Sequence, residues 1–232
     1  MKRLLLLSNS TNHGEEYLAW AKNYVNEFLE GIDDNILFIP YAGVTISWDD
    51  YYEKVQEVLT EFGKQMDSIH HFQDPIKAVQ QAKAILVGGG NTFQLFGLCQ
   101  KQGIFSPIRK KIEEGVPYIG WSAGSNLACP KLSTTNDMPV YEPPSFDGLS
   151  IVPFQINPHY TNLTIEGHGG ESRNDRLKEY MALNPQMNIL CLREASMLEL
   201  IGDKYSIKGE HDAIMMKNNE IQNWSRGDER VY

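Results

Sequence analysis

Short apolar runs alternate with longer amphipathic segments over the first two-thirds of the 232-residue chain. Four of the runs are typical of strands buried on both faces of a sheet, namely residues 4–8, 35–40, 84–87 and 116–119. Apolar residues recur at helical spacing in segments 17–29 and 48–62, and a glycine follows each segment. Strands that alternate with helices predict a largely parallel sheet joined by crossover helices.

The last third of the chain has a different pattern. Three strand-like runs, residues 197–201, 205–208 and 213–216, are separated by short turn signals rich in Gly, Asn and Asp. This pattern predicts antiparallel hairpins. With no repeat or linker in the sequence, we expect one α/β domain over residues 1–232, with a largely parallel central sheet flanked by helices and hairpins toward the C-terminus.

Composition limits the possible partners. The formal net charge of -9 argues against a nucleic-acid-binding surface, which normally carries a basic excess. The leucine run at residues 4–7 is too short for a signal peptide or a membrane span, so we interpret it as the first strand. Three cysteines in apolar contexts predict buried thiols in a reducing compartment: Cys99, Cys129 and Cys191. We therefore expect a cytoplasmic protein with no nucleic-acid or membrane partner. The sequence carries no signal for an oligomeric state.

The strongest local motif is Gly-Trp-Ser-Ala-Gly at residues 120–124, directly after the predicted strand 116–119. It matches the G-x-S-x-G turn, in which a tight strand-to-helix connection exposes a nucleophilic serine, here Ser122. The backbone N–H of Ala123 and the start of the following helix favour negative charge near that serine. A glycine-flanked turn around an ordinary serine fits the same five residues about equally well.

A second motif, Gly88, Gly89, Gly90 and Asn91, ends the preceding predicted strand. If the two strands are neighbours, both turns meet at the carboxyl edge of the sheet, where open α/β folds place their sites. A glycine run there can direct backbone N–H groups toward an oxyanion. Phosphate binding or a plain tight turn are the alternatives, whereas no G-x-G-x-x-G spacing is present.

A serine nucleophile needs a base, and we favour His159, which Pro158 places after the apolar run 149–154. His168, in a glycine-rich segment, is the second choice. The other four histidines are interpreted as structural or solvated: His13, His70, His71 and His211. No metal-binding spacing of histidines or cysteines is recognisable, so we predict no metal.

The base needs a carboxylate that orients it. Asp137 lies between Ser122 and His159 in the sequence, and Glu194 follows the predicted strand 188–192. The residue pattern does not choose between these two acids.

Five sequence blocks, in order, closely resemble the peptidase E family of α-aspartyl dipeptidases: residues 5–11, 87–95, 118–124, 134–139 and 155–159, with 167–168 and 170–173 further on. The resemblance implies a fold related to class I glutamine amidotransferase domains, with serine in place of their cysteine. It implies hydrolysis of small peptides with an N-terminal aspartate (Asp-X), without metal or cofactor. Ser122 matches the family nucleophile and His159 the base. We take Glu194 as the partner of His159, and Asp137 as required for substrate binding or site architecture.

An aspartyl substrate also needs a cation, preferably a bidentate arginine. Arg173 and Arg176 lie one helical turn apart after the glycine-rich segment, and the resemblance favours Arg173. Two other interpretations stay open. One is a different hydrolase on the same scaffold, such as an esterase or a peptidase of other specificity, and the other is a non-enzymatic small-molecule-binding domain.

Overall fold

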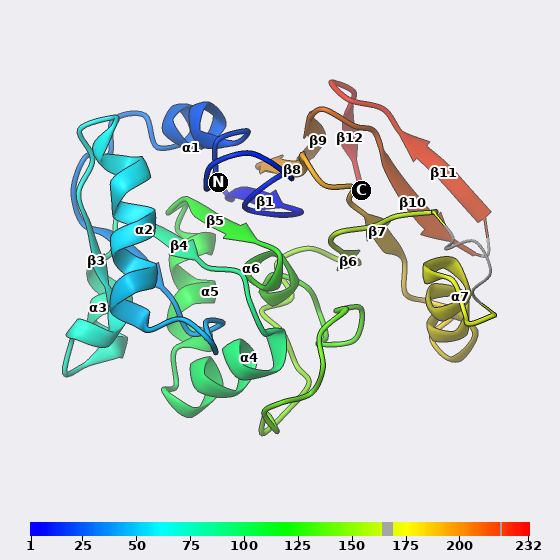
Figure 1. Ribbon diagram of the computed structural model, residues 1–232, viewed down its shortest axis with the longest axis horizontal. Helices are drawn as coiled ribbons and strands as arrows, with labels where there is room; N and C mark the ends of the chain where they lie inside the picture. The colour runs from blue at the N-terminus through cyan, green and yellow to red at the C-terminus, as the bar shows by residue number, and fades with distance from the viewer. Residues whose placement is uncertain (164–168, 219) are drawn as a thin grey trace.

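A computed structural model describes residues 1–163, 169–218 and 220–232 (Figure 1). Its centre is an eight-stranded sheet with the strand order β12 (Glu229–Val231), β9 (Lys204–Gly209), β8 (Ser196–Ile201), β1 (Arg3–Leu7), β5 (Tyr118–Trp121), β4 (Ala84–Val87), β2 (Ile36–Ile39) and β3 (Met66–Ser68). On one side of β1 the neighbouring strands β5, β4, β2 and β3 run parallel to one another. On the other side, β8, β9 and β12 pair in antiparallel fashion. The predicted α/β fold with a largely parallel sheet is confirmed.

Both faces of this sheet are covered, which explains why its strands are continuous apolar runs. Along β1, Leu4 and Leu6 pack on one face with four helices: α3 (Pro75–Gln81), α4 (Thr92–Lys101), α5 (Phe105–Glu113) and α6 (Ala123–Leu127). Leu5 and Leu7 pack on the other face with α1 (Lys22–Phe28) and α2 (Trp48–Thr60). Burial of each such leucine contributes about 1.5–3 kcal/mol relative to exposure.

A second, four-stranded sheet has the order β11 (Glu220–Trp224), β10 (Ala213–Lys217), β7 (Ile189–Cys191) and β6 (Gln155–Asn157). Figure 1 shows the remaining helix, α7 (Arg173–Leu183), beside this sheet and apart from the other helices. Leu4 of β1 and Leu190 of β7 belong to one hydrophobic cluster that joins the two sheets. This shared core supports the prediction of a single domain, which stays a prediction.

Two predicted elements have different bounds in the structure. In segment 17–29 only Lys22–Phe28 is helical, because Leu18 has φ +56° and its N–H donates to the carbonyl of Ser10. Its apolar spacing reflects burial of turn residues rather than helix. The strand predicted at 116–119 instead runs from Tyr118 to Trp121, so that Ser122 follows the strand directly.

The C-terminal hairpins are partly as predicted. β8 and β9 form one antiparallel hairpin, and β10 pairs with β11 in another. The turn at residues 209–212 does not close a hairpin, because it carries the chain from the large sheet to the small one. Gly209 makes this change of direction with φ +97°, at a position where an added Cβ would lie 2.2 Å from the carbonyl oxygen of Ala195.

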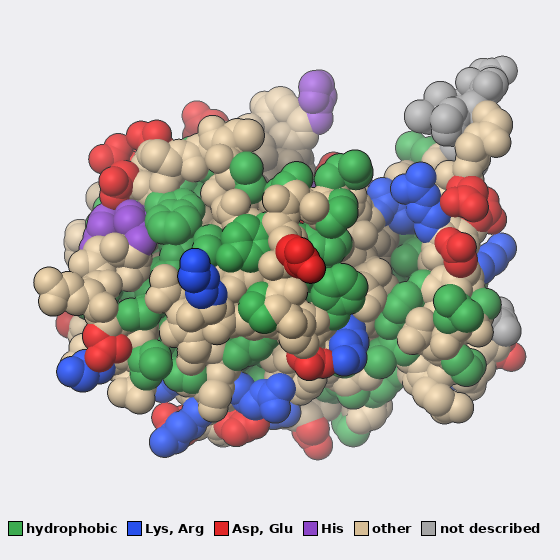
Figure 2. Space-filling view, turned by 90° about the horizontal axis from the view of Figure 1, so that it is seen from below, with side chains coloured by type: hydrophobic (Ala, Val, Ile, Leu, Met, Phe, Trp, Pro, Cys, Tyr) green, Lys and Arg blue, Asp and Glu red, His purple; other side chains and the backbone are tan. Residues whose placement is uncertain are grey.

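The three cysteines are buried free thiols, as predicted. Burial raises the pKa of Cys129 and of Cys191 to about 12, so neither is a thiolate at neutral pH. On the face shown in Figure 2, basic side chains stand among acidic ones rather than in one continuous area. Within the described part of the chain, no helix is both long and apolar enough to cross a membrane.

Close packing of α6 on β4 generates a first prediction. A Cβ added at Gly124 would lie 2.3 Å from the carbonyl oxygen of Val87, and this neighbour is rigid backbone. We expect Gly124→Ala to lower the free energy of unfolding by about 1–3 kcal/mol, as overpacked cores do. Urea denaturation measures this. Gly169→Ala is the matched control, because a Cβ at Gly169 meets nothing within 4 Å and should leave stability nearly unchanged.

Candidate active site

Ser122 stands in a strained backbone conformation between β5 and α6. Its φ of +52° is in the left-handed region, and its N–H donates to the carbonyl of Leu7 at 3.0 Å. A Cβ at Gly120 would lie 2.5 Å from the carbonyl group of Gly124, so the two flanking glycines allow the tight turn. The structure therefore forms the G-x-S-x-G turn, and the alternative of an ordinary loop serine does not account for this strain.

His159 lies between Ser122 and Glu194. Its Nε2 is 2.9 Å from Ser122 Oγ, and its Nδ1 is 3.0 Å from Glu194 Oε1. The side chains of His159 and Glu194 are both accessible to solvent, at 38% and 58% exposed respectively. The contact of Glu194 with Nδ1 constrains the orientation of the imidazole ring. Glu194, rather than Asp137, makes this contact.

Two residues that the sequence analysis did not single out hold this arrangement together. The Oγ of Ser8, after β1, accepts the backbone N–H of His159 at 2.8 Å and donates to the carbonyl of Leu192 at 2.9 Å. The neighbouring Asn9 Oδ1 accepts the N–H of Ala195 at 2.9 Å. These buried side chains connect the end of β1 to the loops that carry His159 and Glu194. The signals for them in the sequence were their position at the end of a predicted strand and their place in the block 5–11 of the family resemblance.

The glycine run after β4 lies beside Ser122, as predicted from the pairing of β4 with β5. The structure excludes two of the four residues of this run as oxyanion donors. The N–H of Gly88 donates to the carbonyl of Ile39, and that of Asn91 donates to the carbonyl of Ala42, so neither is free for an oxyanion. Gly89 and Gly90 line the cavity at Ser122, and within the described residues their N–H groups have no protein acceptor. Asn91 instead caps α4 with its side chain.

Tyr51 of α2 forms a hydrogen bond with the glycine turn. Its hydroxyl donates to the carbonyl of Gly89 at 3.0 Å and accepts the indole N–H of Trp121, also at 3.0 Å. Tyr17 lies 3.2 Å from the same hydroxyl. Burial raises the pKa of Tyr51, so its hydroxyl keeps its proton and remains a donor. The Tyr51 hydroxyl thus contacts both the glycine turn, through Gly89, and Trp121, the residue before Ser122.

Asp137 contacts the start of α4 rather than His159. Its Oδ2 accepts the backbone N–H of Thr92 at 2.7 Å, the hydroxyl of the same Thr92, and the hydroxyl of Thr135 at 2.9 Å. A carboxylate at a helix N-terminus is favoured by the helix dipole. Asp137 also lines the cavity that contains Ser122.

The cavity has a volume of about 500 Å³ and includes Ser122 and His159 among its lining residues. Of the described lining residues, Lys54 of α2 supplies the permanent positive charge, and its ammonium lies 4.5 Å from the ring centre of Tyr17. Arg173, predicted to bind an aspartyl group, begins α7 and does not line this cavity. Burial, and then the charge of Arg176, lowers the pKa of Arg173. His168 lies outside the described residues.

A serine, a histidine and a carboxylate in hydrogen-bonded series, at the carboxyl edge of an α/β sheet and beside a glycine turn, define the class of serine peptidases and related hydrolases. Comparisons with known proteins give the family. The chain belongs to peptidase family S51, whose model matches residues 4–208.

The relatives agree over nearly the full length. Peptidase E from Nostoc sp. is 46% identical over 219 residues, which are 94% of this chain and 90% of the relative. Peptidase E from Shigella flexneri serotype 5b is 44% identical over 94% of both chains. The crystal structure of a peptidase from an acI-B1 Actinobacterium has a TM-score of 0.71 at 16% identity and covers 100% of this chain and 97% of its own, which shows the shared fold.

The contact between Tyr51 and Gly89 generates the next prediction. We expect Tyr51→Phe to slow covalent labelling of Ser122 by a fluorophosphonate about tenfold, because the glycine turn loses the bond that orients its N–H groups. This is less than the ~10²–10³-fold cost of deleting an oxyanion donor outright. Tyr52→Phe is the control, since the Tyr52 hydroxyl donates to Met66 and not to the site. Equal labelling rates in the two variants would show that Tyr51 does not orient the glycine turn for the reaction of Ser122.

Proposed function

We propose that this peptidase hydrolyses small peptides with an N-terminal aspartate, using Ser122 as nucleophile, His159 as base and Glu194 as the residue that orients the base. The observation that carries the proposal is the pair of hydrogen bonds of His159, at 2.9 Å to Ser122 and 3.0 Å to Glu194. The preference for aspartate rests on the resemblance to α-aspartyl dipeptidases and on the charges in the cavity. The buried thiols are consistent with a cytoplasmic location.

Ser122 Oγ attacks the scissile carbonyl carbon while its proton passes to His159 Nε2. Glu194 accepts the Nδ1–H and stabilises the imidazolium. The oxyanion of the tetrahedral intermediate receives hydrogen bonds from the N–H of Ala123 and from Gly89 and Gly90. His159 then gives its proton to the leaving amine, and water, activated by the same base, hydrolyses the acyl-enzyme and restores Ser122.

The charges in the cavity match the two ends of an aspartyl residue. Among the described lining residues, Asp137 is the one carboxylate. In the proposed complex it pairs with the ammonium group of the substrate. Lys54 offers the positive charge for the aspartyl side chain. The sequence-based proposal for this role was Arg173, and both cations are tested below.

The nucleophile is tested first. We expect wild-type protein to hydrolyse Asp-Leu faster than Glu-Leu or Leu-Leu, and Ser122→Ala to lose up to about 10⁶-fold in kcat, as serine peptidases do without their nucleophile. Amine release measured by chromatography gives the rates, and thermal melting confirms that the variant is folded. Retention of more than a tenth of wild-type turnover would show that another residue is the nucleophile.

Substrate specificity is tested by replacing each candidate cation with methionine. Aspartate and asparagine have nearly the same shape, so a site that separates Asp-Leu from Asn-Leu must respond to charge. We expect Lys54→Met to lower kcat/KM for Asp-Leu about tenfold or more while changing Asn-Leu little, which corresponds to roughly 1.4 kcal/mol or more of transition-state stabilisation.

Arg173→Met is the matched variant for this test, because it removes a cation of the same charge outside the cavity. If Arg173→Met compresses the Asp-Leu to Asn-Leu ratio and Lys54→Met does not, Arg173 recognises the aspartate and our assignment of Lys54 is wrong. Equal losses on both substrates would make the altered cation structural.

A further inference from the structure

Two histidines and an aspartate converge on the surface at the first turn of α2. His70 and His71 belong to the short helix η1 (Ile69–His71). Their Nε2 atoms lie 2.9 and 2.8 Å from the same oxygen, Asp49 Oδ1. Among the described residues, this is the group of His, Cys, Asp and Glu side chains whose three ligand-type atoms all lie within 4.8 Å of one another.

These separations are close to those of a metal site. With metal–nitrogen and metal–oxygen bonds of about 2.0–2.2 Å, the ligand atoms of a tetrahedral Zn²⁺ lie roughly 3.3 Å apart. Asp49 therefore has to move away from each imidazole by about half an ångström to admit an ion. Two imidazoles and one carboxylate select divalent transition ions such as Zn²⁺ over Mg²⁺ or Ca²⁺, which prefer oxygen ligands.

The imidazole rings are held in the orientation that a metal requires. The hydroxyl of Ser68, which is buried, lies 2.7 Å from His70 Nδ1. When Nδ1–H donates to this hydroxyl, Nε2 presents its lone pair toward Asp49. Trp48 packs edge-on against His70, and Tyr52 against His71, with ring centres 5.7 and 5.4 Å apart.

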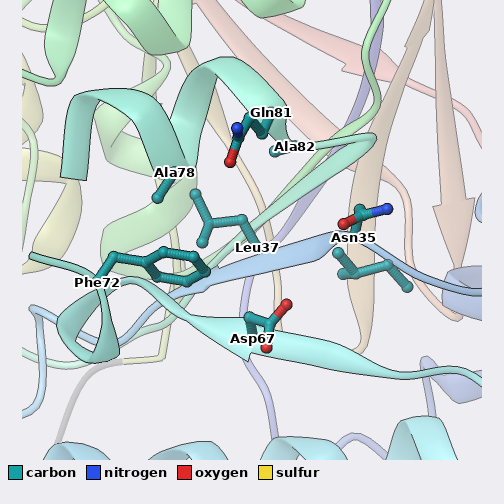
Figure 3. Close-up of a pocket in the computed structure, with 8 residues that line it drawn as sticks. Asn35, Leu37, Asp67, Phe72, Ala78, Gln81 and Ala82 are labelled. Atoms are coloured by element: carbon teal, nitrogen blue, oxygen red, sulfur yellow. The ribbon is translucent and has the colours of Figure 1, made fainter. Parts of the chain in front are cut away.

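The turn that carries the histidines is anchored by Ile69, which is buried in the hydrophobic core. Figure 3 shows the ring of Phe72, the residue after η1, beside Leu37 and Ala78 in a small hollow between the sheet and α3. The His71 side chain is 46% exposed, so an ion reaches the cluster from solvent. On the face shown in Figure 2, histidine side chains are visible at the surface.

We propose that Asp49, His70 and His71 form a structural binding site for Zn²⁺ or a similar divalent transition ion, with water at the fourth position. The ion connects the first turn of α2 to η1. Helix α2 also carries Tyr51 and Lys54, which line the cavity at Ser122, so the ion stabilises that side of the cavity without taking part in the chemistry.

Calorimetric titration of the metal-free full-length protein with ZnCl₂ tests the site. We expect one ion per chain with a Kd on the order of a micromolar, weaker than four-ligand structural sites. At about a hundred times Kd, the melting temperature should rise by roughly 5 °C or more. His71→Gln and Asp49→Asn should each remove this binding, and Ser68→Ala should weaken it about 10–100-fold through the lost orientation of His70.

His13→Gln and His211→Gln are the matched controls, because these histidines lie outside the cluster. Melting without metal shows that each variant is folded. Unchanged zinc binding in a combined Asp49→Asn, His71→Gln variant, or no binding by the wild type below about a hundred times the expected Kd, would overturn the proposal. Loss of binding in the cluster variants alone supports it whatever the peptide specificity turns out to be.

Discussion

The site depends on hydrogen bonds that Ser8 and Asn9 make from the large sheet to loops of the small one. Ser122 follows strand β5 of the large sheet, whereas His159 and Glu194 follow strands of the small sheet. The hydroxyl of Ser8 fixes the backbone of His159, and the amide of Asn9 fixes Ala195 next to Glu194. These two short polar side chains therefore help to set the distance between Ser122 and His159, and in enzymes a misplacement of about 1 Å costs a large factor in rate.

Helix α2 contributes two residues, Tyr51 and Lys54, to the wall of the cavity at Ser122. Tyr51 holds the carbonyl of Gly89, and Lys54, three residues further on, lines the same cavity. Residues three apart on a helix lie on neighbouring positions of one face, so the two roles follow from one placement of the helix. The N-cap Ser47, which accepts the N–H of Asp50, and the first-turn acids help to fix that placement.

The sequence was sufficient for the strand–helix alternation, the turn at Ser122, and the choice of His159, since each depends on local pattern or on a motif. The residue pattern left Asp137 and Glu194 undecided, and the choice of Glu194 came from the family resemblance alone, because the distances of the two acids to His159 depend on how the two sheets pack. The roles of Ser8, Tyr51 and Lys54 were missed for the same reason: each acts across a gap of many residues without a motif. Asp49 lies 21 residues from His70, so their convergence was invisible as well.

The order of strands in the large sheet has a consequence for biosynthesis. The central strand β1 pairs with β5 on one side and with β8, near the end of the chain, on the other. Partners so distant in sequence form late and slowly, because loop closure must precede their contacts. Glu194 lies just before β8, so a chain that has not yet been extended to β8 lacks both the second neighbour of β1 and the carboxylate that contacts His159. Before residue 194 is made, the nascent protein cannot form the hydrogen bond that joins Glu194 to His159 in the folded structure.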